Sequence, residues 1–147
     1  MLTLGLQTDF DVILRVIMAF LLGGIIGWER ERHGISAGIR TYGAISLGAC
    51  LYGIISINIP GADPSRIASQ VATGIGFLGG GVIFRQGDYV SGLTTAATLW
   101  ATAAVGLAVA FNMYVISIIT SAIMVLMLYL PRLRWWKKIT GRVIKAD

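Results

Sequence analysis

The residues of this sequence that are best able to do chemistry lie at the edges of long uncharged runs. In the segment DPSRIASQ, Asp63 precedes Pro64, and Arg66 and Gln70 follow at about one helical turn from each other. One interpretation makes Asp63 a helix N-cap and Pro64 the first helical residue. The other makes Asp63, Arg66 and Gln70 a polar entrance whose charged and amide groups face a cavity.

A second set of charged residues lies in the segment GWERERHGISAGIRT. Its carboxylates and guanidinium groups are close enough in sequence to form ion pairs that close a loop on itself. Exposed pairs of this kind contribute only about 0 to 1 kcal/mol, so stability alone is a weak reason for them. We therefore predict a functional polar cluster in two parts, with Asp63, Arg66 and Gln70 at one edge of the uncharged runs and Glu29, Arg30, Glu31 and Arg40 at the opposite edge.

A glycine motif raises the question of nucleotide binding. The stretch GIGFLGGGVIF, residues 74–84, begins with G-x-G-x-x-G, the pattern that holds a dinucleotide pyrophosphate at the start of a helix. That function needs a preceding strand and an acidic residue about 20 positions later. Here the glycines lie inside an uncharged run between Arg66 and Arg85. We therefore predict that they pack helices and bind no nucleotide.

Enzymatic catalysis is not predicted. The chain has one cysteine, Cys50, and one histidine, His33, so a thiolate cluster or a multi-histidine metal site is not expected within it. No nucleophile lies next to a base in the apolar runs. No cofactor is expected, and the identity of any bound metal ion is left open.

The composition is that of a membrane protein. Apolar side chains make up 56% of the 147 residues and charged ones 13%, and the mean hydropathy is +0.78, whereas soluble domains average about 25% charged residues. The amino terminus lacks a basic segment and carries Asp9 and Asp11, which argues against a cleaved signal peptide. Five runs, uncharged except for Asp11 and Arg15, approach the roughly 20 residues that cross a bilayer. They extend over 10–28, 41–59, 67–84, 93–111 and 113–130.

These runs predict an all-α, polytopic membrane domain over residues 1–131, in which five transmembrane helices form a bundle. Lysine and arginine set its orientation, because cytoplasmic flanks retain positive charge. One side of a five-span bundle receives only Arg66, while the other receives six basic residues from 132 onward and Arg30, Arg32, Arg40 and Arg85. The amino terminus is therefore expected outside and the carboxyl terminus in the cytoplasm.

Residues 132–147 form a basic tail that contains Trp135 and Trp136. Tryptophan suits the lipid headgroup region, and each basic residue near anionic lipid contributes about 1 kcal/mol of attraction. The tail is therefore predicted to lie on the cytoplasmic membrane surface and not to bind nucleic acid.

Small residues recur at helical spacing in three of the runs, and in a bilayer such residues let helix backbones approach one another. Helix packing is predicted for Gly74, Gly76, Gly79, Gly80 and Gly81 in the third run, Thr94, Thr98, Thr102 and Gly106 in the fourth, and Gly23 and Gly27 in the first. Arg15 is expected to pair with Asp11 one turn earlier or to extend outward to the membrane surface. The alternative is a role for Arg15 inside the bundle.

Several blocks of the sequence, in this order, resemble the MgtC/SapB family of bacterial inner-membrane proteins. They are G-x-E-R-E from Gly27, GISAGIRT from Gly34, DPSRIASQV from Asp63, GIGFLGGGVI from Gly74 and GLTTAATLW from Gly92. The resemblance implies an inner-membrane location and a link to magnesium limitation and survival inside host cells. For some members it also implies an action on the proton-translocating ATP synthase. Larger members carry a soluble domain after the fifth span, for which the residues after 131 are too few.

Two functions from different classes fit these observations. The first is a non-catalytic interaction protein whose polar and glycine-rich faces bind a second copy, first expected as a dimer, or a membrane partner such as the ATP synthase. The second is a small transporter or channel for a cation such as magnesium, with a polar entrance at Asp63, Arg66 and Gln70. Magnesium needs oxygen ligands, and the carboxylates all lie near the predicted membrane edges. We therefore favour the first function.

Overall fold

The computed structural model describes residues 9–61 and 63–132. Within these ranges the chain forms five α-helices and one antiparallel hairpin. In chain order the elements are α1 (Asp9–Glu31), α2 (Ile39–Asn58), α3 (Pro64–Gly81), β1 (Phe84–Gln86), β2 (Tyr89–Ser91), α4 (Leu93–Ala110) and α5 (Tyr114–Tyr129), followed by a 3₁₀ turn (Leu130–Arg132). The prediction of five helices is confirmed.

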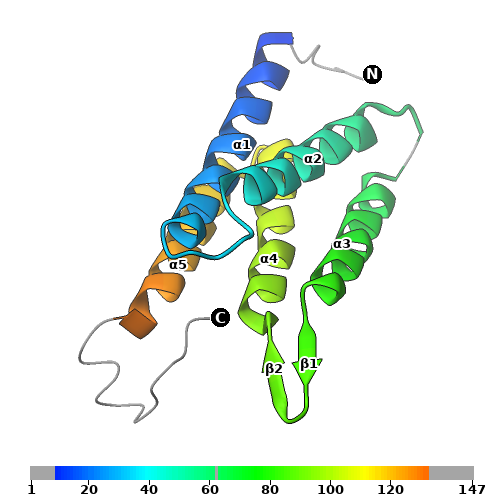
Figure 1. The fold of residues 1–147 in the computed structure, drawn as a ribbon. Helices are drawn as coiled ribbons and strands as arrows, with labels where there is room; N and C mark the ends of the chain where they lie inside the picture. Colours follow the sequence, from blue (N-terminus) through cyan, green and yellow to red (C-terminus); the bar gives the residue numbers. More distant parts are fainter. Residues whose placement is uncertain (1–8, 62, 133–147) are drawn as a thin grey trace.

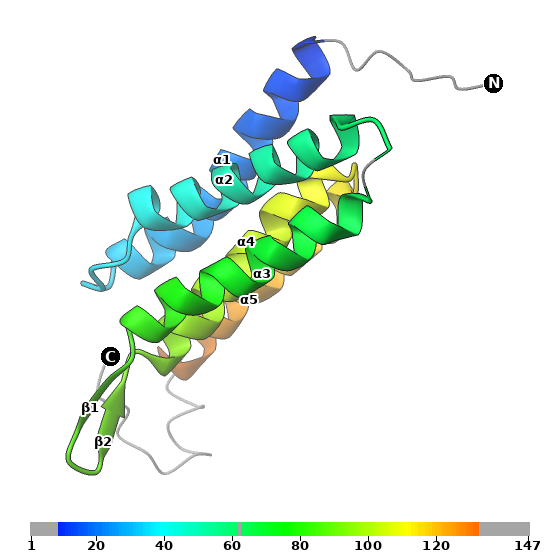
Figure 2. The same ribbon diagram turned by 90° about the vertical axis from the view of Figure 1, so that its right-hand side faces the viewer.

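Helix α4 occupies the centre of the bundle and contacts each of the other four helices. Figures 1 and 2 show α1 and α2 side by side on one side of α4, whereas α3 and α5 lie along its other flanks. Helix α3 contacts mainly α2 and α4. It is therefore a peripheral helix, and most of its circumference is exposed.

Three helices in the described part of the chain are long and apolar enough to cross a membrane, namely α1, α2 and α4. Helix α5 is apolar throughout but has only 16 residues. Helix α3 has 18 residues, among them Arg66 and Gln70 and five glycines, and these lower its mean hydropathy. Each of the five predicted spans therefore corresponds to a helix, and three of these helices have the length and composition of a membrane span.

The third run gives the main correction to the predicted boundaries. A span was predicted over 67–84, but α3 begins at Pro64 and ends at Gly81. The backbone N–H of Val82 closes the helix on the carbonyls of Gly79 and Gly80. Three successive glycines weaken a helix because glycine loses the most conformational freedom when it is ordered. The helix therefore ends before the apolar run does.

A β-hairpin joins α3 to α4, which the all-α prediction missed. Strands β1 and β2 pair in antiparallel register, with Gln86 opposite Tyr89. The two residues between them are Gly87 and Asp88, and Gly87 has a φ of 61°. A positive φ is what a two-residue hairpin turn requires, and glycine supplies it without a steric penalty. The expected loop at 85–92 is thus an ordered hairpin.

Helix α2 crosses α1 and α4 at very short range around one residue, Ser46. A Cβ added to Gly23 of α1 would lie 2.6 Å from the Cβ of Ser46 and 2.6 Å from the Tyr42 carbonyl oxygen. A Cβ added to Gly106 of α4 would overlap the carbonyl group of Ser46. Ser46 is fully buried between these two glycines. The three helices therefore pack backbone against backbone, as small residues permit in a bilayer.

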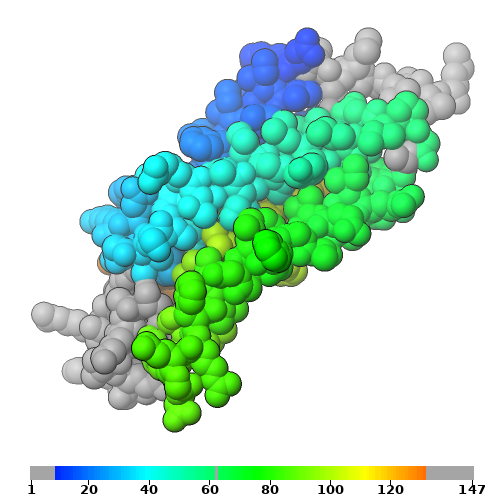
Figure 3. All heavy atoms as spheres, turned by 45° about the vertical axis from the view of Figure 1, so that its right-hand side comes forward, coloured from blue at the N-terminus to red at the C-terminus, as the bar shows by residue number. Residues whose placement is uncertain are grey.

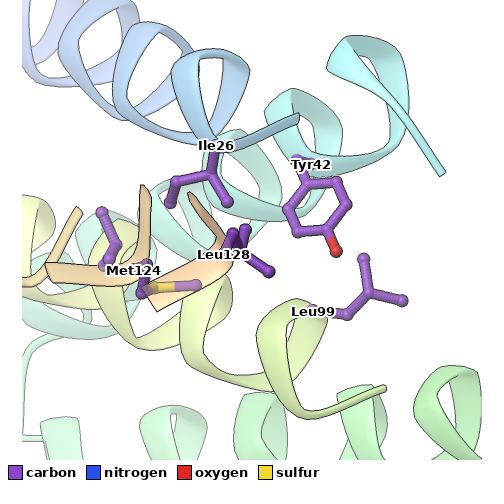
Figure 4. Close-up of a cluster of buried hydrophobic side chains, with 6 residues drawn as sticks. Ile26, Tyr42, Leu99, Met124 and Leu128 are labelled. Carbon is purple, nitrogen blue, oxygen red and sulfur yellow. The ribbon is translucent and has the colours of Figure 1, made fainter. Parts of the chain in front are cut away.

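The apolar core continues from this crossing toward the end of α1. Its side chains come from α1, α2, α4 and α5 and include Ile26, Tyr42, Leu99, Met124 and Leu128. Figure 4 shows the Tyr42 side chain extending from α2 toward Leu99 on α4. The Tyr42 hydroxyl is 2.6 Å from Thr98 Oγ1, so its polar end is satisfied inside the bundle.

Candidate functional site

Asp63 is the N-cap of α3, as one of the two interpretations predicted. Its Oδ1 accepts a hydrogen bond of 2.9 Å from the backbone N–H of Ser65, and its Oδ2 accepts one of 2.8 Å from the Ser65 hydroxyl. Pro64 follows as a first-turn residue. The bond from the Ser65 backbone, then the one from its hydroxyl, lowers the pKa of the Asp63 carboxyl below its ordinary value of 3.8.

The lowered pKa of Asp63 predicts how α3 responds to acid and to substitution. The carboxylate favours the folded state fully above pH about 4, and this contribution is lost as the pH falls through the lowered pKa. Asp63→Ala should lower the midpoint of detergent-induced unfolding, whereas Asp63→Asn should stay near the wild type because asparagine also caps. The midpoint is measured by circular dichroism at neutral pH. Equal loss in both variants would mean that capping is not what Asp63 does.

Arg66 and Gln70 lie on the exposed side of the first turns of α3. With Asp63, Ile67 and Ser69 they line a shallow pocket of about 380 Å³. Gln70 also lines a groove between α2 and α3 whose other walls are mostly apolar. In the space-filling view, α2 and α3 lie side by side and α4 is visible between them (Figure 3). These residues therefore share a surface pocket on α3, and their role as an entrance stays a prediction.

Four of the five glycines of α3 make no close packing contact within the described part of the chain, so their predicted role in helix packing would need a partner outside it. A Cβ added to Gly74, Gly76, Gly80 or Gly81 would meet nothing within 4 Å. Gly79 is the exception, since its Cβ would lie 3.6 Å from the Cβ of Ala96 on α4. The same helix exposes Ser69, Thr73 and Phe77, and Phe77 is 85% exposed. We call the side formed by Ser69, Thr73, Gly76, Phe77 and Gly80 the open face of α3.

The small residues of α4, in contrast, are mostly buried within the chain. Thr98, Thr102 and Gly106 are buried, whereas Thr94 is exposed. Thr98 and Thr102 donate their hydroxyl hydrogens to backbone carbonyls of their own helix, at 2.9 Å and 2.7 Å for the carbonyls four residues earlier. This side of α4 therefore packs inside the chain, and so do Gly23 and Gly27 of α1.

Glu29 and Arg30 belong to the last turn of α1 and are buried, although the sequence placed them in an exposed loop. Arg30 Nη2 donates a hydrogen bond of 2.8 Å to Thr95 Oγ1 on α4. Glu29 Oε1 lies 3.4 Å from His33 Nδ1. Helix α1 continues three residues past its predicted end, and this extension carries both side chains into the bundle.

The remaining residues of this segment are held by contacts other than the predicted ion pairs. Glu31 Oε2 accepts a hydrogen bond of 2.9 Å from the backbone N–H of Ile39 at the start of α2. The Arg32 guanidinium lies over the Trp28 ring, 5.5 Å from its centroid. Arg40 is exposed. These contacts replace the ion-paired loop that the sequence suggested.

The two parts of the predicted polar cluster lie at opposite ends of α2. Asp63 follows the end of α2, and Glu31 contacts its beginning. Because α2 has 20 residues, about 30 Å of helix separates them. The two parts are therefore separate groups of residues, as their positions at opposite edges of the predicted spans implied. Within residues 9–61 and 63–132, no group of three or more His, Cys, Asp or Glu side chains is placed to hold a metal ion.

Arg15 has a role that the favoured interpretation missed. It is 6% exposed, and its Nη1 donates a hydrogen bond of 3.2 Å to the carbonyl oxygen of Ala110. Both Asp11 and Arg15 are described, and no ion pair joins them. Arg15 therefore lies inside the bundle at the end of α4, where the carbonyl groups of a helix are left without partners.

A bundle of apolar helices with buried polar contacts between them, three of them long enough to cross a bilayer, defines an α-helical membrane protein. The chain belongs to the MgtC family, whose family model matches residues 16–134. This confirms the resemblance seen in the sequence blocks.

The curated relatives are longer than this chain. A protein of Escherichia coli K12 named "Putative magnesium transporter YhiD" is 41% identical over 127 residues, which cover 80% of this chain and 59% of the relative. Protein MgtC of Brucella abortus is 51% identical over 89 residues, covering 60% of this chain and 37% of the relative. Protein MgtC of Salmonella typhimurium is 46% identical over 97 residues, covering 66% and 42%. No solved structure matches the chain.

Proposed function

We propose that this chain is a non-catalytic membrane module that acts by binding another membrane-embedded helix through the open face of α3. The observation that carries the proposal is the contrast between two similar helices. Thr98, Thr102 and Gly106 of α4 are buried within the chain, whereas a Cβ added to Gly74, Gly76, Gly80 or Gly81 of α3 would meet nothing within 4 Å in the described part of the chain. Hydroxyl groups and glycine backbone gain little from contact with lipid tails, and they favour close helix association.

A second copy of the chain is the first partner that we propose for this face. Thr73, Gly76 and Gly80 repeat at the three- and four-residue spacing of a helix face. Two such faces can approach closely and exchange weak hydrogen bonds between backbones. The proton-translocating ATP synthase, which the family resemblance suggests, is the partner proposed in place of a second copy.

All five helices cross the membrane in this proposal, with the amino terminus outside and the carboxyl terminus in the cytoplasm of a bacterial inner membrane. The distribution of lysine and arginine supports this orientation. A role in magnesium homeostasis is supported by family membership and by the name of the relative YhiD. The basic tail, residues 132–147, lies almost entirely outside the described residues, and its place on the membrane surface stays a prediction.

Disulfide cross-linking tests the proposed dimer. Gly76→Cys, in a background with Cys50→Ala, is expected to give mostly cross-linked dimer after mild oxidation in native membranes. Ile118→Cys is the matched control, because Ile118 on α5 is 50% exposed and belongs to no small-residue face. Cross-linked dimer is quantified by non-reducing gel electrophoresis.

Equal cross-linking at both positions would count against a dimer through α3. Native mass spectrometry of the wild-type chain in mild detergent separates the two proposed partners. A dimer or a co-purifying membrane protein supports the interaction function, and a monomer without any partner contradicts it.

Magnesium transport is the second candidate function, favoured by the polar pocket at Asp63, Arg66 and Gln70 and by the name of the relative YhiD. Magnesium usually keeps several waters and binds one or two carboxylates. In this candidate function Asp63 supplies one carboxylate ligand. Magnesium uptake is measured in liposomes that contain the purified chain. If uptake is lost in Asp63→Ala but kept in Asp63→Asn, then Asp63 acts as a helix cap and not as a magnesium ligand. Uptake lost in both variants would favour transport.

A further inference from the structure

The groove between α2 and α3 is mostly apolar and has a volume of about 380 Å³. Figure 3 shows the two helices side by side. On α3 the groove is lined by Val71, Gly74 and Leu78, which lie roughly opposite the open face at the helical repeat. A Cβ added to Gly74, or to Gly48 on the α2 side of the groove, would meet nothing within 4 Å. A linear apolar ligand therefore has room between the two helices.

The α2–α3 groove is continuous with the polar pocket at the beginning of α3. Ile67 and Gln70 line both of them, and Asp63 and Arg66 complete the polar pocket. Within residues 9–61 and 63–132, Arg66 forms no ion pair and the side-chain amide of Gln70 has no hydrogen-bond partner. A guanidinium, a carboxylate and an amide therefore stand at one end of an apolar groove.

The order of side chains along α3 matches the order of chemical groups along a phospholipid. Asp63 and Arg66 place opposite charges at the beginning of the helix. Gln70 lies one turn further, about 6 Å along the axis, where its amide can donate to an ester carbonyl of the glycerol backbone. The groove follows α3 from Ile67 to Leu78, which is about 16 Å of helix. One leaflet contributes about 15 Å to the hydrocarbon core of a bilayer, so the groove has the length of one acyl chain.

The polar end of the groove decides which lipid it can hold. Lipid tails are as apolar as the groove walls, so the acyl chain alone gives little preference for the groove over the surrounding bilayer. An unpaired amide at membrane depth is costly, and an ester carbonyl of a bound lipid would satisfy Gln70. Arg66 attracts a phosphate group. Asp63 attracts a protonated amine, whereas it repels a headgroup that carries only negative charge.

We propose that the α2–α3 groove binds one phospholipid of the outer leaflet whose headgroup carries both a phosphate and an amine, as phosphatidylethanolamine does. Arg66 binds the phosphate, Asp63 the amine, Gln70 an ester carbonyl, and the groove one acyl chain. The inference rests on the proposed placement of α3 across the membrane with its beginning outside, but it makes no use of the open face. The lipid and a second copy of the chain can therefore occupy opposite sides of α3.

Native mass spectrometry tests this site on the full chain released from nanodiscs that contain phosphatidylethanolamine and phosphatidylglycerol in equal amounts. The wild type is expected to retain phosphatidylethanolamine and little phosphatidylglycerol. Gly74→Leu fills the groove from a position where a Cβ meets no other atom, and it is expected to retain neither lipid. Gly80→Leu is the matched control, because it makes the same substitution at an equally open position on the opposite side of α3. It should retain the lipid as the wild type does.

Two further variants test the headgroup contacts. Arg66→Gln is expected to retain about tenfold less phosphatidylethanolamine, because it loses a charge-assisted hydrogen bond to the phosphate. Asp63→Asn keeps a residue that caps the helix but loses the negative charge, so it should retain the two lipids equally. A preference in Asp63→Asn that equals that of the wild type would contradict the contact with the amine.

The proposal is overturned if the wild type retains no lipid or prefers phosphatidylglycerol, or if Gly74→Leu retains as much lipid as Gly80→Leu. Gly48→Leu fills the same groove from α2 and replaces Gly74→Leu if that variant fails to fold. The same spectra separate this inference from the proposed function, since Gly80→Leu is expected to lose the dimer and keep the lipid, and Gly74→Leu to do the reverse. Loss of the dimer in Gly74→Leu would mean that a second copy, and not a lipid, fills the groove.

Discussion

Replacing Gly106 by alanine is expected to force α2 away from α4 and to destabilise the bundle by about 3 kcal/mol or more, the upper end of what overpacking costs. The new Cβ would overlap the carbonyl group of Ser46, which is helix backbone and cannot rotate away as a side chain could. Gly23→Ala should act in the same direction, because its Cβ would meet Ser46 and Tyr42 at 2.6 Å. Both effects are measured as the shift in unfolding free energy during titration with a denaturing detergent.

Gly74→Ala and Gly81→Ala are the matched controls for this prediction. Nothing lies within 4 Å of a Cβ at either position, and alanine favours a helix interior over glycine by up to about 1 kcal/mol. These variants are therefore expected to match or exceed the wild type in stability. If Gly106→Ala unfolded at the same detergent fraction as Gly74→Ala, the short approach of α2 and α4 would be wrong.

Reversing the charge of Arg15 is expected to have the second largest effect. Arg15→Glu would place a buried carboxylate next to the carbonyl oxygen of Ala110, at the negative end of α4. An uncompensated buried charge destabilises a protein by about 3 to 5 kcal/mol. Arg15→Lys keeps the charge and should lose far less. The same detergent titration measures both variants.

Asp11→Asn separates this explanation from the ion pair that the sequence suggested. Asp11 is exposed and forms no ion pair with Arg15, so this variant should unfold like the wild type. An Arg15→Glu variant of normal stability would show that the side chain reaches water and does not lie at the end of α4.

Long apolar runs made the helices predictable from the sequence. Each predicted span overlaps one helix, because the length of an uncharged apolar run is visible in the local sequence and determines whether a helix can cross the bilayer. The boundaries differ by up to three residues where other forces act, as at the end of α1, which continues to Glu31. There Arg30 contacts Thr95, a residue 65 positions away, and no local pattern indicates such a contact.

The sequence could not show which small-residue helix faces pack within the chain and which stay exposed. Gly76 of α3 and Gly106 of α4 both belong to stripes of small residues with the same spacing. Only the structure shows that Gly106 meets Ser46 and that Gly76 meets nothing. Small residues permit close approach, but the pattern carries no information about which helix approaches.

The hairpin was missed although its signal is present. Phe84, Tyr89 and Val90 favour strands, and the pair Gly87–Asp88 between the strands is typical of a two-residue turn. The apolar run through Phe84 concealed it, because a count of uncharged residues does not distinguish a helix from the strand that follows it.

The weak hydrophobicity of α3 has a consequence for how the protein is made. A helix with an arginine, a glutamine and five glycines gains little free energy by leaving the insertion machinery for lipid alone. Only the short hairpin separates it from α4, which is far more apolar. We therefore expect the two segments to be released into the bilayer as a pair, with α3 waiting at the translocon until α4 has been synthesised.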